Sequence, residues 1–287
     1  TLHKEDIPLL EGYAVTDKAD GDRYMMFLSK DSRIYYLDNN IRKVIQTDLY
    51  SSDINLGGTL IDGELVVDKD GKKVFLAFDL IIYGRTDLRE NNEYNLIKRL
   101  DLIDDIFKTI NDSETFTIKI KDFRMTNISK DVNDLMDEIP MKGYNNDGLI
   151  FTPINEPYSK RNTLQILKWK PSHLNTIDLY SIQRQGEKIW DLFVMGDHHN
   201  KVPFKCEGFD TSLTKFDETL IDPVTNEPFK SETVIEYYFD KMQQLFIPLR
   251  TRWDKTVNPK KHGNYITVAC DIWANINNPV DIRDFSP

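Results

Sequence analysis

The sequence has few cysteines and no long apolar run. Its two cysteines, Cys206 and Cys270, stand far apart and outside any Cys-x-x-Cys or Cys/His cluster. This excludes a zinc site of that type and a disulfide framework, and it indicates a reducing, cytoplasmic setting. No apolar stretch approaches the length of a membrane span, and the N-terminal residues resemble no secretion signal, so we expect no membrane partner.

Basic residues are also in deficit, since the formal net charge is -10. This excludes a general nucleic-acid coat, so any polyanion must be bound by a local basic groove. The content of 40% hydrophobic and 29% charged residues is typical of a globular protein, and 287 residues are enough for two domains. The chain starts at Thr1 rather than Met, which indicates a piece of a longer polypeptide.

Strand-like segments dominate the first half of the chain. They are rich in apolar, aromatic and branched residues and cover 24–29, 34–37, 60–67, 74–82 and 116–120. Apolar residues at steps of three and four predict a helix within 95–110, and a shorter helix is expected at 132–139. Strands and helices mix without βαβ regularity, which favours an α+β fold over a doubly wound sheet.

Pro171 and the polar residues after it mark a domain boundary. We therefore expect one domain over 1–172 and a second over 173–287. The second should contain short strands at 177–183, 189–195, 202–206 and 233–239, a polar surface insertion at about 210–232 and a closing helix at about 267–276.

The segment Lys18-Ala19-Asp20-Gly21-Asp22-Arg23 brings a lysine, carboxylates, a turn glycine and an arginine together. A lysine amine attacks an electrophile only when deprotonated, and its usual pKa of about 10.4 prevents this unless burial or nearby cations lower the pKa. Arg23 is such a cation, so the segment fits a nucleophilic lysine. Taken alone, it fits an ordinary turn with solvated charges at least as well.

Four further clusters share one design, in which charged residues lie at the end of an apolar strand or in the turn beside it. They are Asp62-Gly63-Glu64-Leu65-Val66, Phe75-Leu76-Ala77-Phe78-Asp79-Leu80, Asp147-Gly148-Leu149-Ile150-Phe151 and Leu167-Lys168-Trp169-Lys170-Pro171. Near the end of the chain stands Arg252-Trp253-Asp254-Lys255. Six clusters in a fixed order are far more specific than any one of them.

In this order and at these separations, the clusters resemble the motifs of the covalent nucleotidyltransferase superfamily, which comprises mRNA capping enzymes and ATP-dependent ligases. The forms Asp147-Gly148 and Lys168-Trp169-Lys170-Pro171 resemble capping enzymes, especially those of large cytoplasmic DNA viruses. The resemblance implies a nucleotidyltransferase domain of antiparallel sheets with flanking helices, ATP-grasp-like or DNA ligase-like. A C-terminal OB-fold β-barrel should follow it.

For function, the resemblance implies an mRNA guanylyltransferase. Lys18 would attack the α-phosphate of GTP, release pyrophosphate, and pass GMP to the 5′-diphosphate end of mRNA. Two alternatives stay open, an ATP-dependent RNA or DNA ligase and a catalytically silent RNA-binding module. A silent module should have lost one of the residues Lys18, Asp147, Lys168 or Lys170, and all four are present.

The resemblance also implies roles around the nucleotide. Phe78 would stack on guanine, Arg23 would contact the ribose, and Asp20 belongs to the same GTP-binding set. Asp147 would hold Mg²⁺ or Mn²⁺, while Glu64 would bind the ribose or assist the metal. The alternatives are a core phenylalanine at Phe78 and ordinary turn acids at the two carboxylates.

Cations are needed where phosphoryl transfer accumulates negative charge. Lys168 and Lys170 lie two residues apart on a predicted strand and would share one face, unless they are merely solvated. Arg252 and Lys255, oriented by Asp254, would bind the β- and γ-phosphates. Because these three residues belong to the second domain, the resemblance implies that this domain closes over GTP.

Further expectations concern the wider context. The pairs 160–161 and 260–261 are basic and either contact RNA or are solvated. The resemblance implies fusion to triphosphatase and methyltransferase domains in a longer polypeptide, and work in a viral factory or virion in the host cytoplasm.

Overall fold

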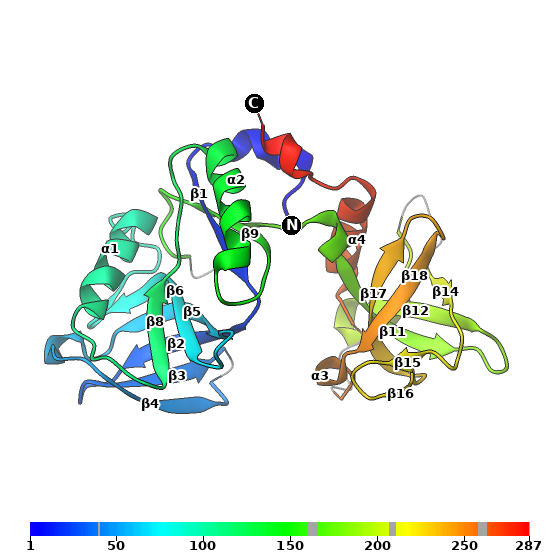
Figure 1. Cartoon of the computed structure of the whole chain (residues 1–287), viewed down its shortest axis with the longest axis horizontal. Helices are drawn as coiled ribbons and strands as arrows, with labels where there is room; N and C mark the ends of the chain where they lie inside the picture. The colour runs from blue at the N-terminus through cyan, green and yellow to red at the C-terminus, as the bar shows by residue number, and fades with distance from the viewer. Residues whose placement is uncertain (40, 160–165, 207–210, 258–262, 287) are drawn as a thin grey trace. The chain divides into compact units, whose positions relative to one another are not determined.

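The structure is a computed structural model, and it describes residues 1–39, 41–159, 166–206, 211–257 and 263–286 (Figure 1). The chain forms two compact units. The first comprises Leu2–Trp169 and Ile282–Pro287, and the second comprises Thr1 and Lys170–Asp281. We call them the N-terminal unit and the C-terminal unit.

The larger sheet of the N-terminal unit has seven strands. They are β2 (Asp22–Leu28), β3 (Arg33–Asp38), β4 (Val44–Tyr50), β5 (Leu60–Val67), β6 (Lys73–Tyr83), β7 (Thr86–Asp87) and β8 (Phe116–Ile120). Their order is β4-β3-β2-β5-β6-β7, and β8 pairs with β6. All pairs are antiparallel except the parallel pair of β6 and β8.

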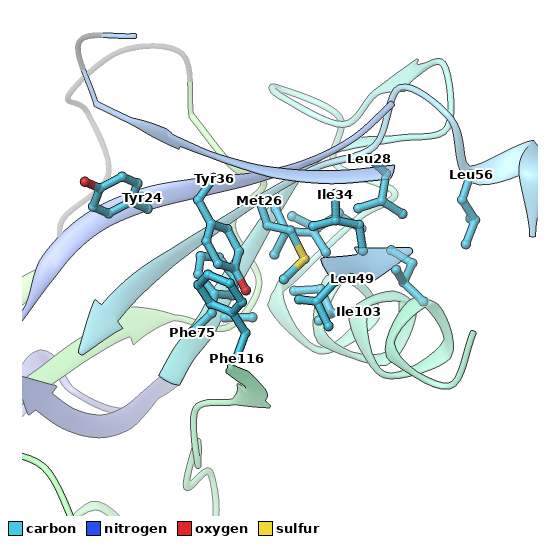
Figure 2. Close-up of a cluster of buried hydrophobic side chains, with 14 of the residues drawn as sticks. Tyr24, Met26, Leu28, Ile34, Tyr36, Leu49, Leu56, Phe75, Ile103 and Phe116 are labelled. Carbon is cyan, nitrogen blue, oxygen red and sulfur yellow. The ribbon is translucent and has the colours of Figure 1, made fainter. Parts of the chain in front are cut away.

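The core of this unit consists of side chains from the sheet and one helix (Figure 2). Tyr36 stacks on Phe75 with ring centroids 4.9 Å apart, and Phe116 meets Tyr36 edge-on at 5.4 Å. Helix α1 (Leu96–Phe107) begins after Asn95, whose side chain accepts a hydrogen bond from the Lys98 backbone. The apolar stripe of α1 is buried against this cluster, as its periodicity requires.

A smaller sheet lies in the same unit. Its strands β1 (Tyr13–Ala19), β9 (Asn146–Pro153) and β10 (Leu167–Trp169) are antiparallel, in the order β1-β9-β10. Helix α2 (Ile128–Glu138) contacts β1. Although η6 (Ile282–Phe285) follows residue 173, it packs with this unit, where Phe285 stacks on Phe151 at 5.7 Å. Short 3₁₀ turns η1 (Lys4–Leu9), η2 (Ile54–Leu56) and η3 (Ile139–Met141) complete the unit.

The C-terminal unit has a six-stranded sheet. Its strands are β11 (Thr176–Gln183), β12 (Ile189–Met195), β13 (Lys201–Pro203), β14 (Leu213–Lys215), β17 (Thr233–Asp240) and β18 (Leu245–Thr251). The order is β13-β12-β11-β17-β18, and β14 pairs with β12. Helix α4 (Ile266–Asn277) places Trp273 edge-on against Phe239 at 4.7 Å. Shorter elements are η4 (Ser172–Leu174), η5 (Asp197–His199) and α3 (Trp253–Thr256).

The segment at about 210–232, expected as a surface insertion, contains regular structure. It includes β14 and the two-stranded pair β15 (Ile221–Asp222) and β16 (Glu227–Pro228). Thr214 and Asp222 are buried, and their polar groups are satisfied by hydrogen bonds. The Thr214 hydroxyl donates to Phe246 O, and the Asp222 carboxylate accepts from backbone N–H groups. Part of the segment therefore belongs to the folded core of the unit.

Both units consist mainly of antiparallel sheets with few helices. This confirms the predicted α+β class, with antiparallel sheets and flanking helices. No helix within the described ranges is long and apolar enough to cross a membrane.

Candidate active site

Lys18 and Asp147, which are 129 residues apart, are in direct contact. Strands β1 and β9 are irregular at this point, because Asp17 pairs with Leu149 whereas Ala19 pairs with Asn146. Lys18 Nζ donates to Asp147 Oδ1 at 2.5 Å, and the two side chains are 18% and 21% exposed. The structure thus brings together the predicted nucleophile and the predicted metal ligand.

A cavity of about 470 Å³ lies beside this pair. Five predicted site residues line it: Lys18, Arg23, Glu64, Phe78 and Lys168. Residues from both sheets form its walls, which also include Thr16, Asp62, Lys121, Phe123, Ile150, Thr152 and Tyr158. A second cavity of about 550 Å³ has no basic residue among its described lining and so does not suit an anion.

Arg23 is fixed by a buried carboxylate. Its Nε and Nη2 donate to Asp62 at 2.9 and 2.5 Å, and the Tyr158 hydroxyl donates to the same carboxylate at 2.8 Å. The hydrogen bond to Asp62 raises the pKa of Arg23, whereas burial and Asp62 raise the pKa of Tyr158. Arg23 therefore stays cationic and Tyr158 stays neutral at the edge of the cavity.

Phe78 is a wall of the cavity rather than part of the core cluster. Arg23 Cζ and Lys121 Nζ lie 5.9 and 6.0 Å from its ring centroid. The next residue, Asp79, is buried and accepts from Arg99 Nε at 2.6 Å and from Arg99 Nη2 at 3.1 Å. This bidentate pair fixes the strand that presents the aromatic ring.

Lys121 is a buried cation that the sequence analysis did not identify. Its side chain is 1% exposed, and Nζ donates to Asp17 O at 3.0 Å and lies 3.7 Å from Glu64 Oε2. Burial lowers the pKa of Lys121, against the opposing charges of Asp17 and Glu64. Burial raises the pKa of Glu64, and Asp147 adds to this increase, while Lys121 and Lys18 oppose it. Glu64 thus shares its part of the cavity wall with the buried cation Lys121.

The other predicted phosphate ligands are placed differently. Lys168 pairs in register with Ile150 and lines the cavity. Lys170 follows the end of β10 and belongs to the C-terminal unit, so its expected position on the same face remains a prediction. Asp20 is exposed between β1 and β2 and is not part of the cavity lining.

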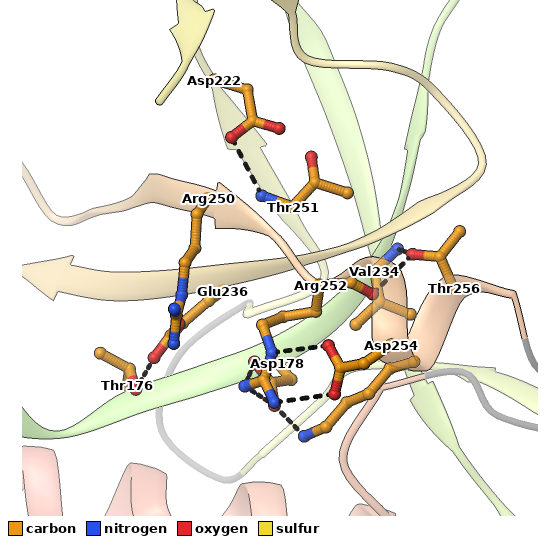
Figure 3. A network of polar contacts seen from close by, with 11 residues as sticks. Thr176, Asp178, Asp222, Val234, Glu236, Arg250, Thr251, Arg252, Asp254 and Thr256 are labelled. Atoms are coloured by element: carbon orange, nitrogen blue, oxygen red, sulfur yellow. Dashed lines mark hydrogen bonds and ion pairs between the residues drawn. The ribbon is translucent and has the colours of Figure 1, made fainter. Parts of the chain in front are cut away.

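Arg252, Asp254 and Lys255 form a network in the C-terminal unit (Figure 3). Arg252 Nη1 donates to both Asp178 oxygens at 3.2 and 3.1 Å, and Lys255 Nζ also pairs with Asp178. Asp254 accepts from Arg252 Nε and Nη2, each at 3.1 Å. The predicted contact of Asp254 with Arg252 is present, and Asp178, which is 8% exposed, is an unpredicted anchor for both cations.

Two predicted basic pairs are not described by the structure, and several residues of the cavity were not predicted. The basic pairs 160–161 and 260–261 lie outside the described residues. Lys121 follows an apolar strand, the same signal that marked the other clusters, so the sequence could have identified it. Thr16 and Tyr158 carry no comparable signal.

Chemically, the cavity of the N-terminal unit combines an amine, carboxylates, several cations and an aromatic wall. Cations complement phosphates, and an aromatic face complements a base. These features suit a nucleotide.

Comparison with known proteins decides the family. A family model described as mRNA capping enzyme, catalytic domain, matches residues 1–172. The chain belongs to the mRNA capping enzyme family. This confirms the family predicted from the motifs.

Two curated relatives illustrate the family. The chain is 27% identical to "Probable mRNA-capping enzyme" of Acanthamoeba polyphaga mimivirus, over 93% of this chain and 30% of that protein. It is 31% identical to "mRNA-capping enzyme" of Mus musculus, over 98% of this chain and 47% of that protein. The chain thus spans less than half the length of either relative.

Among solved structures, the chain is similar to "mycobacterial DNA ligase D complexed with ATP and MES". The TM-score is 0.49 at 14% identity, covering 86% of this chain and 91% of that chain.

Proposed function

We propose that the chain is an mRNA guanylyltransferase that works through a covalent lysyl-GMP intermediate. The observation that carries this proposal is the contact of Lys18 Nζ with Asp147 Oδ1 at 2.5 Å, beside a cavity lined by further cations. Membership of the capping enzyme family supports the assignment.

In the first half-reaction, Lys18 attacks the α-phosphorus of GTP. A bond forms between Nζ and phosphorus, the bond from phosphorus to the bridging oxygen breaks, and pyrophosphate leaves. A protonated amine has no lone pair for this attack, so the proton in the Lys18–Asp147 pair must leave first. In the second half-reaction, an oxygen of the RNA 5′-diphosphate attacks the same phosphorus, and the lysine amine leaves with a proton.

Different cavity residues contact different parts of the nucleotide in this proposal. Phe78 stacks on guanine, Arg23 contacts the ribose, and Glu64 binds the ribose or assists the metal. Lys168 and Lys170 stabilise charge on the α-phosphate, and Asp20 supports the Lys18 turn. The support for this arrangement is that Arg23, Glu64, Phe78 and Lys168 line one cavity with Lys18.

The carboxylates fit a divalent cation. Hard cations such as Mg²⁺ and Mn²⁺ prefer carboxylate oxygens and take their remaining ligands from water and phosphate. Glu64 lines the cavity, and Asp147 contacts Lys18, which also lines it. Both would hold the ion, which supplies Lewis-acid stabilisation of phosphate charge.

The C-terminal unit provides the remaining phosphate ligands in this proposal. Arg252 and Lys255, oriented by Asp254, bind the β- and γ-phosphates and align pyrophosphate for departure. The unit closes over GTP in the first step and opens for RNA in the second. We assign the nucleotidyltransferase chemistry to 1–172, which the family match covers, and phosphate closure to the OB-like domain at 173–287.

The partners are GTP and the 5′-diphosphate end of mRNA. The relatives exceed this chain in length, which supports fusion to further domains, proposed as triphosphatase and methyltransferase. A viral relative supports work in the cytoplasm of an infected cell, in a viral factory or virion.

The first prediction tests the covalent step directly. Incubation with labelled GTP and Mg²⁺ should attach label to the protein in an acid-stable form. Lys18→Ala should abolish the adduct without unfolding the protein, because the amine is the bond-forming group, and gel analysis with circular dichroism measures both effects.

The controls separate the alternatives. Lys30→Ala, which changes an exposed lysine of the turn between β2 and β3, should form the normal adduct. Labelled ATP in place of GTP should give none, and chelation of the divalent ion should prevent labelling. Adduct formation from ATP alone would assign the chain to the ligases, and a normal adduct in Lys18→Ala would refute the mechanism.

A further inference from the structure

Thr16 is a buried polar residue that none of the roles above uses. It is 2% exposed, and its Oγ1 is shielded from solvent and has no hydrogen-bond partner within the described part of the chain. Buried hydroxyls almost always have a partner, because an unsatisfied one destabilises the folded state. Valine would fill the same space without the polar atom, so folding alone does not explain a threonine.

Thr16 lines the same cavity as Lys18. The two are alternate residues of β1, and both contribute to the cavity lining although the register of β1 with β9 shifts between Asp17 and Ala19. Asp17, between them, is directed elsewhere, because its carboxylate accepts from Lys142 Nζ at 3.0 Å and from the Tyr144 hydroxyl at 3.3 Å. Rotation about χ1 exchanges the methyl and hydroxyl groups of threonine, so Oγ1 can turn into the cavity without backbone movement.

The position of Thr16 suits the base of a nucleotide. Two residues of strand span about 6.6 Å along the backbone, so Thr16 and Lys18 present their side chains to neighbouring parts of the cavity. Ile150, which pairs with Thr16 across the strands, and Phe78 both line the cavity and provide apolar and aromatic surfaces for a flat ring. The unsatisfied hydroxyl is therefore next to the surface where a base would bind.

We propose that the Thr16 hydroxyl hydrogen-bonds the polar edge of guanine and thereby contributes to the selection of GTP. This inference rests on the proposed function, since it requires a guanine nucleotide in this cavity. A hydroxyl accepts as well as donates, so it can accept from the N2 amino group of guanine, at a position where adenine has no polar atom. A site that leaves a buried polar group unpaired discriminates against a ligand without the matching atom.

The test uses Thr16→Val, which removes the hydroxyl and keeps the shape. The GTP concentration for half-maximal adduct formation should rise about 10-fold, with little change in the maximal rate. Inhibition by GMP should weaken by a similar factor, and inhibition by AMP should not. Thr16→Ser keeps a hydroxyl and should restore most of the affinity.

Thermal unfolding without nucleotide separates binding from folding. Thr16→Val should unfold at the same or a higher temperature than the wild type, because an unsatisfied polar atom is removed. Thr214→Val is a matched control, because this buried threonine donates to Phe246 O at 2.6 Å, and its loss should lower the unfolding temperature without changing the GTP dependence.

Three outcomes overturn the inference: unchanged GTP dependence in Thr16→Val, an equal loss of GMP and AMP binding, or a lower unfolding temperature with a reduced maximal rate. The second would place the contact at the sugar or phosphate. Absence of any adduct in the wild-type chain would instead overturn the proposed function.

Discussion

At the residue scale, buried carboxylates fix two arginines, one that lines the cavity and one behind its wall. Asp62 binds Arg23, and Asp79 binds Arg99 behind Phe78. Removal of one partner of a buried pair leaves an uncompensated buried charge. This lowers the free energy of unfolding far more than the loss of an exposed pair does. The two classes of pair can be compared within this chain.

Arg99→Met should lower the free energy of unfolding by about 3–5 kcal/mol. The Arg99 side chain is 1% exposed, and it also donates to Tyr94 O and Glu156 O. Arg89→Met is the matched control, because Arg89 makes the same bidentate contact with Asp87 at 38% exposure and should cost at most about 1 kcal/mol. Urea denaturation measures both.

A double variant sharpens this comparison. Asp79→Asn added to Arg99→Met removes the stranded charge and should recover part of the lost stability. Equal urea midpoints for Arg99→Met and Arg89→Met would show that the buried pair contributes no more to stability than the exposed pair.

At the element scale, a glycine in strand β5 determines how close the strand lies to the core and thereby positions Asp62 and Glu64. Gly63 lies between Asp62 and Glu64, and a Cβ there would be 2.3 Å from Phe75 Cζ. Phe75 is fully buried and stacked on Tyr36, so its ring cannot move away. Gly63 therefore allows β5 to pass close to the core while its neighbours reach the cavity.

Gly63→Ala should destabilise the protein by about 1–3 kcal/mol, because it overpacks the core at Phe75. It should also slow adduct formation, since Asp62 and Glu64 move with the strand. Chemical denaturation and the labelling rate measure these effects.

The matched control is Gly71→Asn. Gly71 has φ of +80° with no atom within 4 Å of an added Cβ, and asparagine tolerates this conformation. Gly63→Ala combined with Phe75→Leu should regain stability if the clash is the cause. A fully stable Gly63→Ala would contradict the close approach.

At the scale of the whole molecule, the proposed phosphate ligands are divided between two compact units. In the C-terminal unit, Arg252 and Lys255 are paired with Asp178, so their charges are compensated in this structure. A bound triphosphate must therefore compete with Asp178 for them. This competition would occur only in the half-reaction that contains GTP.

Arg252→Ala should slow adduct formation about 100-fold, because it removes the proposed ligand of the leaving pyrophosphate. Transfer of GMP from a preformed adduct to RNA should change little, since pyrophosphate has already left. Single-turnover labelling and transfer assays measure the two steps separately.

Arg250→Ala provides the control within the same segment. Arg250 is 52% exposed and pairs with Glu236, outside the Asp178 network. Its removal should leave both steps near the wild-type rate. Equal damage to both half-reactions by Arg252→Ala would contradict a role in leaving-group alignment.

Local patterns in the sequence predicted much of the fold. The stripe of α1 and the apolar runs of β2, β5, β6 and β17 were sufficient for their assignment. Strands β1 and β4 were not predicted, because polar residues interrupt their alternation, and β18 was not predicted because Pro248 interrupts its apolar run. Strand β1 depends on pairing with a distant segment, as for Ala14 with Thr152, whereas β18 pairs with the preceding strand β17 in a hairpin, as for Phe246 with Phe239.

The sequence by itself determined the family and the candidate groups, because six ordered motifs specify residue types that nucleotidyl transfer requires. Only the tertiary structure decided which groups meet. It placed Lys18 against Asp147, buried Lys121 beside Glu64, and left the Thr16 hydroxyl without a partner. Distance, desolvation and hydrogen bonding arise from contacts between residues far apart in the chain, so no local pattern encodes them.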